Sequence, residues 1–342
     1  MVMELAELVE LGDPAALALA VDGLCDRRDW DGLVELHARL EDAVERGRPL
    51  WPTVTWVEYR LALEAPAERA AAVLRPGAGR FALGPLTEVA ASSHAWADLA
   101  PHLPSPAVAG TVAQERVLRG EDLRGDDRAG ADVLELPLVL ADWEPDYPLP
   151  RYRSDRLLTP DPPDLPEPAP ATPGQAEVLR RPEVVRALLD LVEVWISESE
   201  GRADAVVVAG GPADAVAALG VATPRLAEIE PDDALAWMAW AAGSGGAHGV
   251  RRGGALGRFD AWWAAAALAG ADWPPDPDAL GDALDELRWW AWDDGAPATG
   301  WVLRLAVADE AAGWAAALDA RDTSTEPGRR TVGPDDDPGR PA

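Results

Sequence analysis

The sequence predicts an α+β protein that is predominantly helical, with an N-terminal stacked-helix domain and a C-terminal domain in which helices cover a small mixed sheet. Three observations support this class. Apolar residues recur at helical spacing through the first third of the chain, a strand, helix, strand pattern follows residue 200, and a proline-rich stretch separates the two regions. With 342 residues and 48% hydrophobic content, the chain is long enough for two domains with separate cores.

The N-terminal domain is predicted to span residues 1–130 as consecutive amphipathic helices. Asp13 and Pro14 form a pair typical of a helix start, and Ser105 with Pro106 forms another. The apolar stripe of the first segments consists of Leu17, Val21, Leu24, Leu33, Leu36, Leu40 and Val44. Further helices are expected at residues 51–64, 67–74 and 105–119.

Residues 131–174 are predicted to form an extended, proline-rich linker. The apolar stretch Val133–Leu140 suggests a strand, and Pro137 within it favours a position at the edge of a sheet. The high density of proline between Pro160 and Pro173 excludes helix and favours a semi-rigid tether. We therefore expect the domain boundary in this region.

The C-terminal α/β domain is predicted to span residues 175–321 around a three-stranded sheet. The strands are expected at 205–209, 225–230 and 301–308, with the first two parallel and joined by a right-handed crossover through a short helix at Pro212. The other helices are expected at 182–196, 259–269, 278–292 and 310–318. Residues 322–342 are predicted to be a disordered tail.

The charge balance restricts the classes of partner. Sixty acidic residues against 30 basic ones give a formal charge of -30, which disfavours anionic membranes and bulk binding of nucleic acid. The single cysteine, Cys25, excludes an intrachain disulfide, and the acidic N-terminus does not resemble a secretory signal. The longest apolar run, Ala261–Ala271, is too short to cross a bilayer. We expect a soluble, cytoplasmic protein.

The sequence contains no lysine, which excludes several mechanisms. A Walker A phosphate loop, a Schiff base and a kinase-type lysine all require this residue. The four histidines and the one cysteine form no Cys-x-x-Cys or His-x-x-x-His pair, so we expect no structural zinc site, no cofactor and no catalytic constellation, and we assign no metal ligands. An all-carboxylate magnesium or calcium site remains an alternative in so acidic a chain, although no stretch matches an EF-hand loop.

One segment, Gly243–Arg258, reverses the negative charge of the chain. It is rich in glycine and contains no acidic residue, and the helix that follows offers its N-terminal amides. The predicted ligand-binding residues for an anion are Ser244, His248, Arg251, Arg252 and Arg258. The competing interpretation is that the arginines pair with the surplus carboxylates of the chain.

Two weaker features lie in the same domain. The Gly210-Gly211 turn after a strand could present amides to a ligand, but it lacks the spacing of a dinucleotide-binding loop. The 16 tryptophans are best explained by core packing, although in adjacent pairs such as Trp289-Trp290 one ring is expected to be exposed.

These observations favour a non-enzymatic binding or scaffold protein with a protein partner, which also holds an anionic small molecule in its C-terminal domain. The alternative is an enzyme or sensor that acts on a phosphorylated small molecule or nucleotide at residues 243–258, with His248 as a general acid or base.

Overall fold

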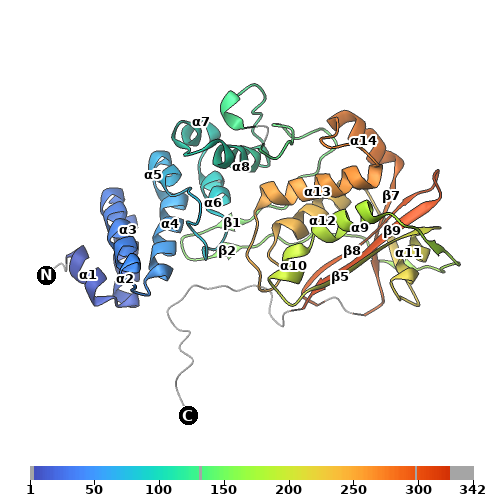
Figure 1. The fold of residues 1–342 in the computed structure, drawn as a ribbon, viewed down its shortest axis with the longest axis horizontal. Helices are drawn as coiled ribbons and strands as arrows, with labels where there is room; N and C mark the ends of the chain where they lie inside the picture. Colours follow the sequence, from blue (N-terminus) through green and yellow to red (C-terminus); the bar gives the residue numbers. More distant parts are fainter. Residues whose placement is uncertain (1–3, 131–132, 297–298, 324–342) are drawn as a thin grey trace, which may run out of the picture.

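The computed structural model describes residues 4–130, 133–296 and 299–323. Within these residues, an N-terminal block of helices lies beside a C-terminal domain built on a seven-stranded sheet (Figure 1). The predicted class, α+β and predominantly helical, is confirmed. In the described part of the chain, no helix combines the length and the apolar character needed to cross a membrane.

The N-terminal helices begin where the sequence supplies capping side chains. The Asp13 carboxylate accepts a hydrogen bond from the Ala15 amide at 3.1 Å, and the Ser105 hydroxyl accepts one from Val108 at 3.3 Å. The predicted stripe is buried, with Val44 only partly covered. The elements of this block are α1 (Leu5–Leu11), α2 (Pro14–Asp26), α3 (Trp30–Glu45), α4 (Trp51–Glu64), α5 (Ala67–Ala72), α6 (Leu86–Ser93), α7 (Trp96–Leu99), η1 (Ala100–His102), α8 (Pro106–Val117) and η2 (Asp127–Ala129).

The C-terminal sheet has the strand order β3-β6-β7-β8-β9-β5-β4, and each neighbouring pair is antiparallel. Its strands are β3 (Ala169–Pro170), β4 (Glu177–Val178), β5 (Arg202–Ala209), β6 (Arg225–Ile229), β7 (Arg288–Asp293), β8 (Trp301–Asp309) and β9 (Trp314–Asp322). The helices of this domain are α9 (Pro182–Asp190), α10 (Glu193–Ser197), α11 (Pro212–Ala218), α12 (Pro231–Gly243), α13 (Gly254–Ala269) and α14 (Pro277–Glu286).

The sheet is larger than predicted, and its neighbouring strands are not parallel. Strands β5 and β6 run in the same direction, but β7, β8 and β9 lie between them. Two of these three strands were expected to be helical. The alanine-rich β9 instead forms a hairpin with β8, because Gly313 adopts a positive φ of 72° and its amide bonds to the Asp309 carbonyl at 2.9 Å.

Both faces of the sheet are covered, which explains the adjacent tryptophans. Trp289 packs in the core formed with α9, α12 and α13, whereas Trp290 and Trp292 pack on the opposite face against α11. Successive side chains of a strand point to opposite faces, so both rings of the Trp289-Trp290 pair are buried. The expectation that one of them is exposed is wrong for this pair. It holds for Trp262-Trp263, where Trp263 is exposed.

The linker is integrated into the fold rather than free. Its proline-rich part supplies the edge strand β3, and β4 adds a strand at the opposite edge. The predicted strand at Val133–Leu140 does not form, because the carbonyls of Pro137 and Val139 accept hydrogen bonds from a buried arginine instead of a neighbouring strand. A separate hairpin of β1 (Arg151–Tyr152) and β2 (Leu157–Leu158) follows.

Of the predicted disordered tail, residues 322–342, the structure describes only Asp322 and Thr323. Its first residue, Asp322, ends β9 and is completely buried, so the domain extends further than predicted. The rest of that prediction, from residue 324, lies outside the described residues.

Candidate functional site

The glycine- and arginine-rich segment Gly243–Arg258 connects α12 to α13 and lies where the two domains meet. Some of its glycines are required by packing. A Cβ atom at Gly257 would lie 2.4 Å from the Ala239 carbonyl oxygen, so α12 and α13 approach closely only without a side chain there. Gly253, the residue directly before α13, has a φ of 101°, a backbone conformation that favours glycine.

Arg251 binds a carboxylate from the other domain. Its Nε and NH2 groups donate to the two oxygens of Glu88 on α6, each at 2.8 Å, and the Tyr152 hydroxyl donates to the same carboxylate at 2.5 Å. The amide of Gly254 also donates to Glu88, at 3.0 Å, and the amide of Ala255 donates to Glu115 of α8 at 2.7 Å. The N-terminal amides of α13 therefore bind two carboxylates of the protein itself, at the place where the sequence predicted an anionic ligand.

The two carboxylates at this helix end differ in acidity. Burial alone would raise the pKa of Glu88, but the charge and hydrogen bonds of Arg251 hold that pKa below its usual value. Burial, and then the negative charge of Glu88, raise the pKa of Glu115 above its usual value. One of the two acids is thus stabilised as the anion, whereas the other is destabilised as the anion.

Arg258 is also used internally. Its guanidinium group is completely buried and forms an ion pair with Glu144 at 2.6 Å. It also donates to the Gln114 side chain of α8 at 2.6 Å and to the carbonyls of Pro137 and Val139. This residue links α13, the linker and α8. Its contacts therefore stabilise the interface between the two domains, here called the joint, which is formed by Arg251, Arg258, Glu88, Gln114, Glu115 and Glu144.

The other predicted residues have separate surroundings. Arg252 pairs with Asp260, whose pKa burial raises to about 6. The Ser244 hydroxyl accepts a hydrogen bond from the Trp195 indole at 2.9 Å and donates to the Ala241 carbonyl at 2.8 Å. The amide of His248 donates to Ser199 at 3.2 Å. The five predicted residues therefore do not converge on one point.

A cavity of about 90 Å³ does lie against this loop. Of the predicted residues, Ser244 and Arg251 line it, together with Leu83, Leu157 and Trp301 from other parts of the chain. Nearby amides of the loop already have acceptors. Ala247 donates to Asp322 at 2.7 Å, and Val250 donates to Glu198 at 3.1 Å. An anion entering here would compete with carboxylates already in place.

A larger cleft, which the sequence analysis did not identify, lies on the N-terminal domain. It has a volume of about 220 Å³ and is lined almost entirely by aromatic and apolar side chains. Trp51 and Phe81 form its rim, with their ring centroids 4.6 Å apart and with 47% and 53% of each residue exposed. Inside it, Trp56 stacks on Tyr59 at 5.5 Å. The sequence feature that could have indicated this cleft is the spacing of three aromatic residues along α4, Trp51, Trp56 and Tyr59.

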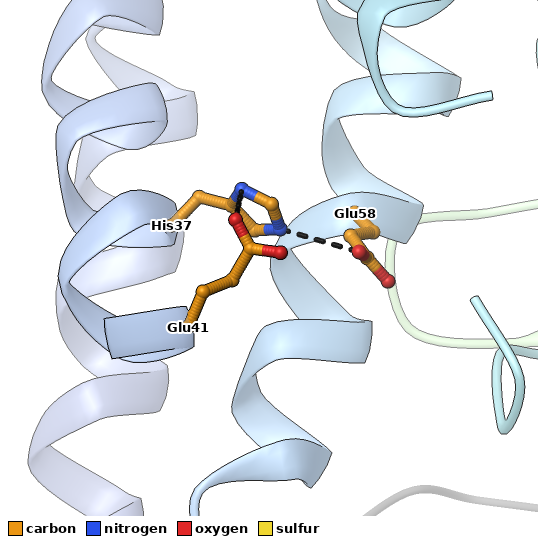
Figure 2. A group of neighbouring side chains, drawn as sticks. All are labelled: His37, Glu41 and Glu58. Atoms are coloured by element: carbon orange, nitrogen blue, oxygen red, sulfur yellow. Dashed lines mark hydrogen bonds and ion pairs between the residues drawn. The ribbon is translucent and has the colours of Figure 1, made fainter. Parts of the chain in front are cut away.

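A more polar hollow of about 380 Å³ adjoins this cleft and shares Trp51 and Phe81 with it. Three carboxylates, from Glu41, Glu45 and Glu58, lie along the hollow. Beside Glu41 and Glu58 lies His37, and the three side chains face one another across α3 and α4 (Figure 2). Among the described residues, this is a group whose atoms lie close enough together to hold a metal ion. A search for His-x-x-x-His pairs misses it because the pattern on α3 is His-x-x-x-Glu.

Comparison with known proteins gives a family but no function. The chain belongs to a family of unknown function, DUF6183, whose sequence profile matches residues 15–324. No curated protein and no solved structure matches the chain. The family match includes both the helical block and the sheet domain, so it covers the joint, the aromatic cleft and the polar hollow alike.

Proposed function

We propose that this member of DUF6183 is a non-enzymatic binding protein whose N-terminal domain holds a segment of a partner protein in the aromatic cleft. The observation that supports the proposal best is the exposure of Trp51 and Phe81 beside an apolar cavity. Large aromatic side chains at a cleft are common anchors of protein recognition, because they bury a large area at little cost in conformational entropy.

The charge of the surroundings selects the partner. The cleft itself is apolar, but the adjoining hollow carries Glu41, Glu45 and Glu58 against Arg75 and Arg80. The molecule as a whole has a formal charge of -30. A segment with one large apolar side chain next to a lysine or arginine would fill the cleft and complement the carboxylates. We therefore commit to a basic, apolar peptide segment as the occupant.

The joint between the domains supports a binding role over catalysis. The charged groups at the joint already contact one another or further buried groups: Arg251 pairs with Glu88, and Arg258 with Glu144 and Gln114. Their contacts stabilise one arrangement of the two domains. The aromatic cleft lies within the N-terminal domain, so a partner can bind there without disturbing these contacts.

Replacing both Trp51 and Phe81 with alanine should abolish peptide binding. A library of 12-residue peptides displayed on phage is selected on the wild-type protein, and the recovered peptides are measured by fluorescence anisotropy. We expect peptides with an aromatic or large aliphatic residue next to a basic one. The double variant should bind them at least about 30-fold more weakly, as expected when interface anchors are truncated.

The matched control is Trp263→Ala, because Trp263 is an exposed tryptophan of the other domain. This variant should bind the same peptides as the wild type does. Selected peptides that lack a basic residue, or that bind the double variant and the wild type equally well, would contradict the proposal.

An anionic ligand at residues 243–258, as an enzyme substrate or a sensed molecule, is the second candidate. The cavity beside Arg251 is the observation that favours it. Inorganic phosphate should then raise the melting temperature of the wild type by a few degrees. A variant with Arg251→Ala and Arg252→Ala should lose this rise, measured from its own baseline. If the rise is the same in both proteins, the loop is not the binding site.

A further inference from the structure

A histidine and two glutamates meet between two N-terminal helices, and two of the three residues, His37 and Glu58, are buried. His37 and Glu41 lie one turn apart on α3, and Glu58 lies on the neighbouring helix α4. Figure 2 shows the three side chains pointing toward one another between these helices. Each offers a ligand atom, and these atoms all lie within 4.8 Å of one another. Such a separation suits three ligands around one metal ion.

The imidazole of His37 lies between the two carboxylates, and one backbone amide from outside the group orients Glu58. The Nδ1 atom of His37 lies 3.4 Å from one oxygen of Glu41, and the second oxygen of Glu58 accepts the amide of Gly79 at 2.7 Å. The Nε2 atom of His37 lies 3.3 Å from the other oxygen of Glu58. The hydrogen bond from Gly79 is a supporting contact of the kind that fixes the direction of a carboxylate ligand.

A cation already lies between the two carboxylates. The guanidinium NH2 of Arg75 contacts Oε1 of Glu41 and lies 3.5 Å from Oε1 of Glu58. The Arg75 side chain is 45% exposed, whereas that of Glu58 is only 5% exposed. The buried carboxylate therefore needs a positive partner, and an arginine that reaches in from solvent supplies it. An ion bound deeper, against His37, would displace this exposed side chain.

We infer that His37, Glu41 and Glu58 form a binding site for a divalent transition-metal ion, with Zn²⁺ as the best match. One imidazole nitrogen and two carboxylate oxygens suit zinc better than magnesium or calcium, which favour oxygen ligands alone. Glu41 and Glu58 also line the hollow of about 380 Å³, which gives the ion an access route and leaves room for a water ligand. The peptide proposal assigns the same two carboxylates to a basic side chain, so zinc is titrated without peptide, and a failure of either proposal leaves the other to its own test.

Zinc titration of the chelator-treated full-length protein tests the site. Competition with a chromophoric chelator at pH 7 should give one Zn²⁺ per chain. Glu41→Gln and His37→Gln should each weaken binding at least about tenfold, because each removes one of three ligands. Glu35→Gln is the matched control, because Glu35 is an exposed glutamate of the same helix that pairs with Arg39 instead. It should leave the affinity unchanged.

Arg75→Ala gives the sharpest discrimination, because the metal site and a purely ionic cluster predict different results. Removing the competing cation should tighten zinc binding by about tenfold. If the cluster is only an ion-pair network, Arg75→Ala gives no tighter binding. Circular dichroism establishes that each variant is folded, and cobalt(II) spectra of the wild type provide a readout independent of the variants. The metal site is disproved if zinc does not bind at one ion per chain, if Glu41→Gln binds zinc as tightly as the wild type, or if the cobalt spectrum shows no histidine nitrogen ligand.

Discussion

Arg258→Met should lower the free energy of unfolding by about 3–5 kcal/mol, the cost of breaking a buried ion pair by removing one partner. The variant leaves the Glu144 carboxylate buried without its cation, and it also removes donors to Gln114 and to two backbone carbonyls. Methionine retains much of the apolar volume, so the loss reports the polar contacts rather than a cavity. Urea denaturation followed by tryptophan fluorescence measures it.

The control for this variant is Arg124→Ala. Arg124 pairs with Asp122 at 2.6 Å, but both side chains are largely exposed. Exposed ion pairs contribute little to stability, so the free energy of unfolding of this variant should stay close to that of the wild type. If Arg258→Met costs no more than Arg124→Ala, the buried network is not what stabilises the joint.

The N-terminal helices could be predicted because their signals are local. Capping pairs such as Asp13-Pro14 and apolar residues at helical spacing act within one or two turns. The structure places α4 and α8 close to the predicted ranges 51–64 and 105–119, and α2 begins at Pro14, directly after the predicted cap. No long-range information was needed for these elements.

The sheet was underestimated because its strands depend on distant partners. Residues 314–322 are rich in alanine and favour a helix by intrinsic propensity, but pairing with β5 and β8 makes them the strand β9. Residues 288–293 continue an apparent helix whose regular part ends at Glu286. The two-residue strands β3 and β4 are too short to carry any pattern of their own.

The candidate sites show the same difference between what local sequence predicts and what depends on distant partners. Local composition identified the positive loop, but the carboxylates that bind Arg251 and Arg258 lie 163 and 114 residues away in the sequence. His37 and Glu58 are 21 residues apart, and only the packing of α3 on α4 brings them together. Residue inventory can suggest a charge or a ligand type, whereas the pairing of distant residues requires the fold.

At the joint, Glu88→Gln should destabilise the protein by about 3 kcal/mol or more at pH 7, because it leaves the buried Arg251 without its bidentate partner. Glu115→Gln should have a smaller effect. The neutral side chain loses the charge that pairs with Arg119 at 2.8 Å, but it keeps an oxygen for the Ala255 amide and removes the repulsion between two buried carboxylates. Urea denaturation of both variants beside the wild type measures the difference.

The pH dependence of the two variants should have opposite signs. The pKa of Glu88 is lowered by folding, so its contribution is complete above the unfolded-state value of about 4.3 and is lost as the pH falls through the folded value. The deficit of Glu88→Gln relative to the wild type should therefore shrink in acid.

The pKa of Glu115 is raised by folding, so the wild type loses stability as the pH rises through that folded value. Glu115→Gln should consequently gain stability relative to the wild type with increasing pH. Unfolding curves from about pH 2 to pH 8 sample the acid window of Glu88 and the higher window of Glu115 under identical conditions. Parallel curves for both variants would mean that the two carboxylates are not distinguished by Arg251. The joint would then be a diffuse cluster of charges rather than an arginine bound to one chosen acid.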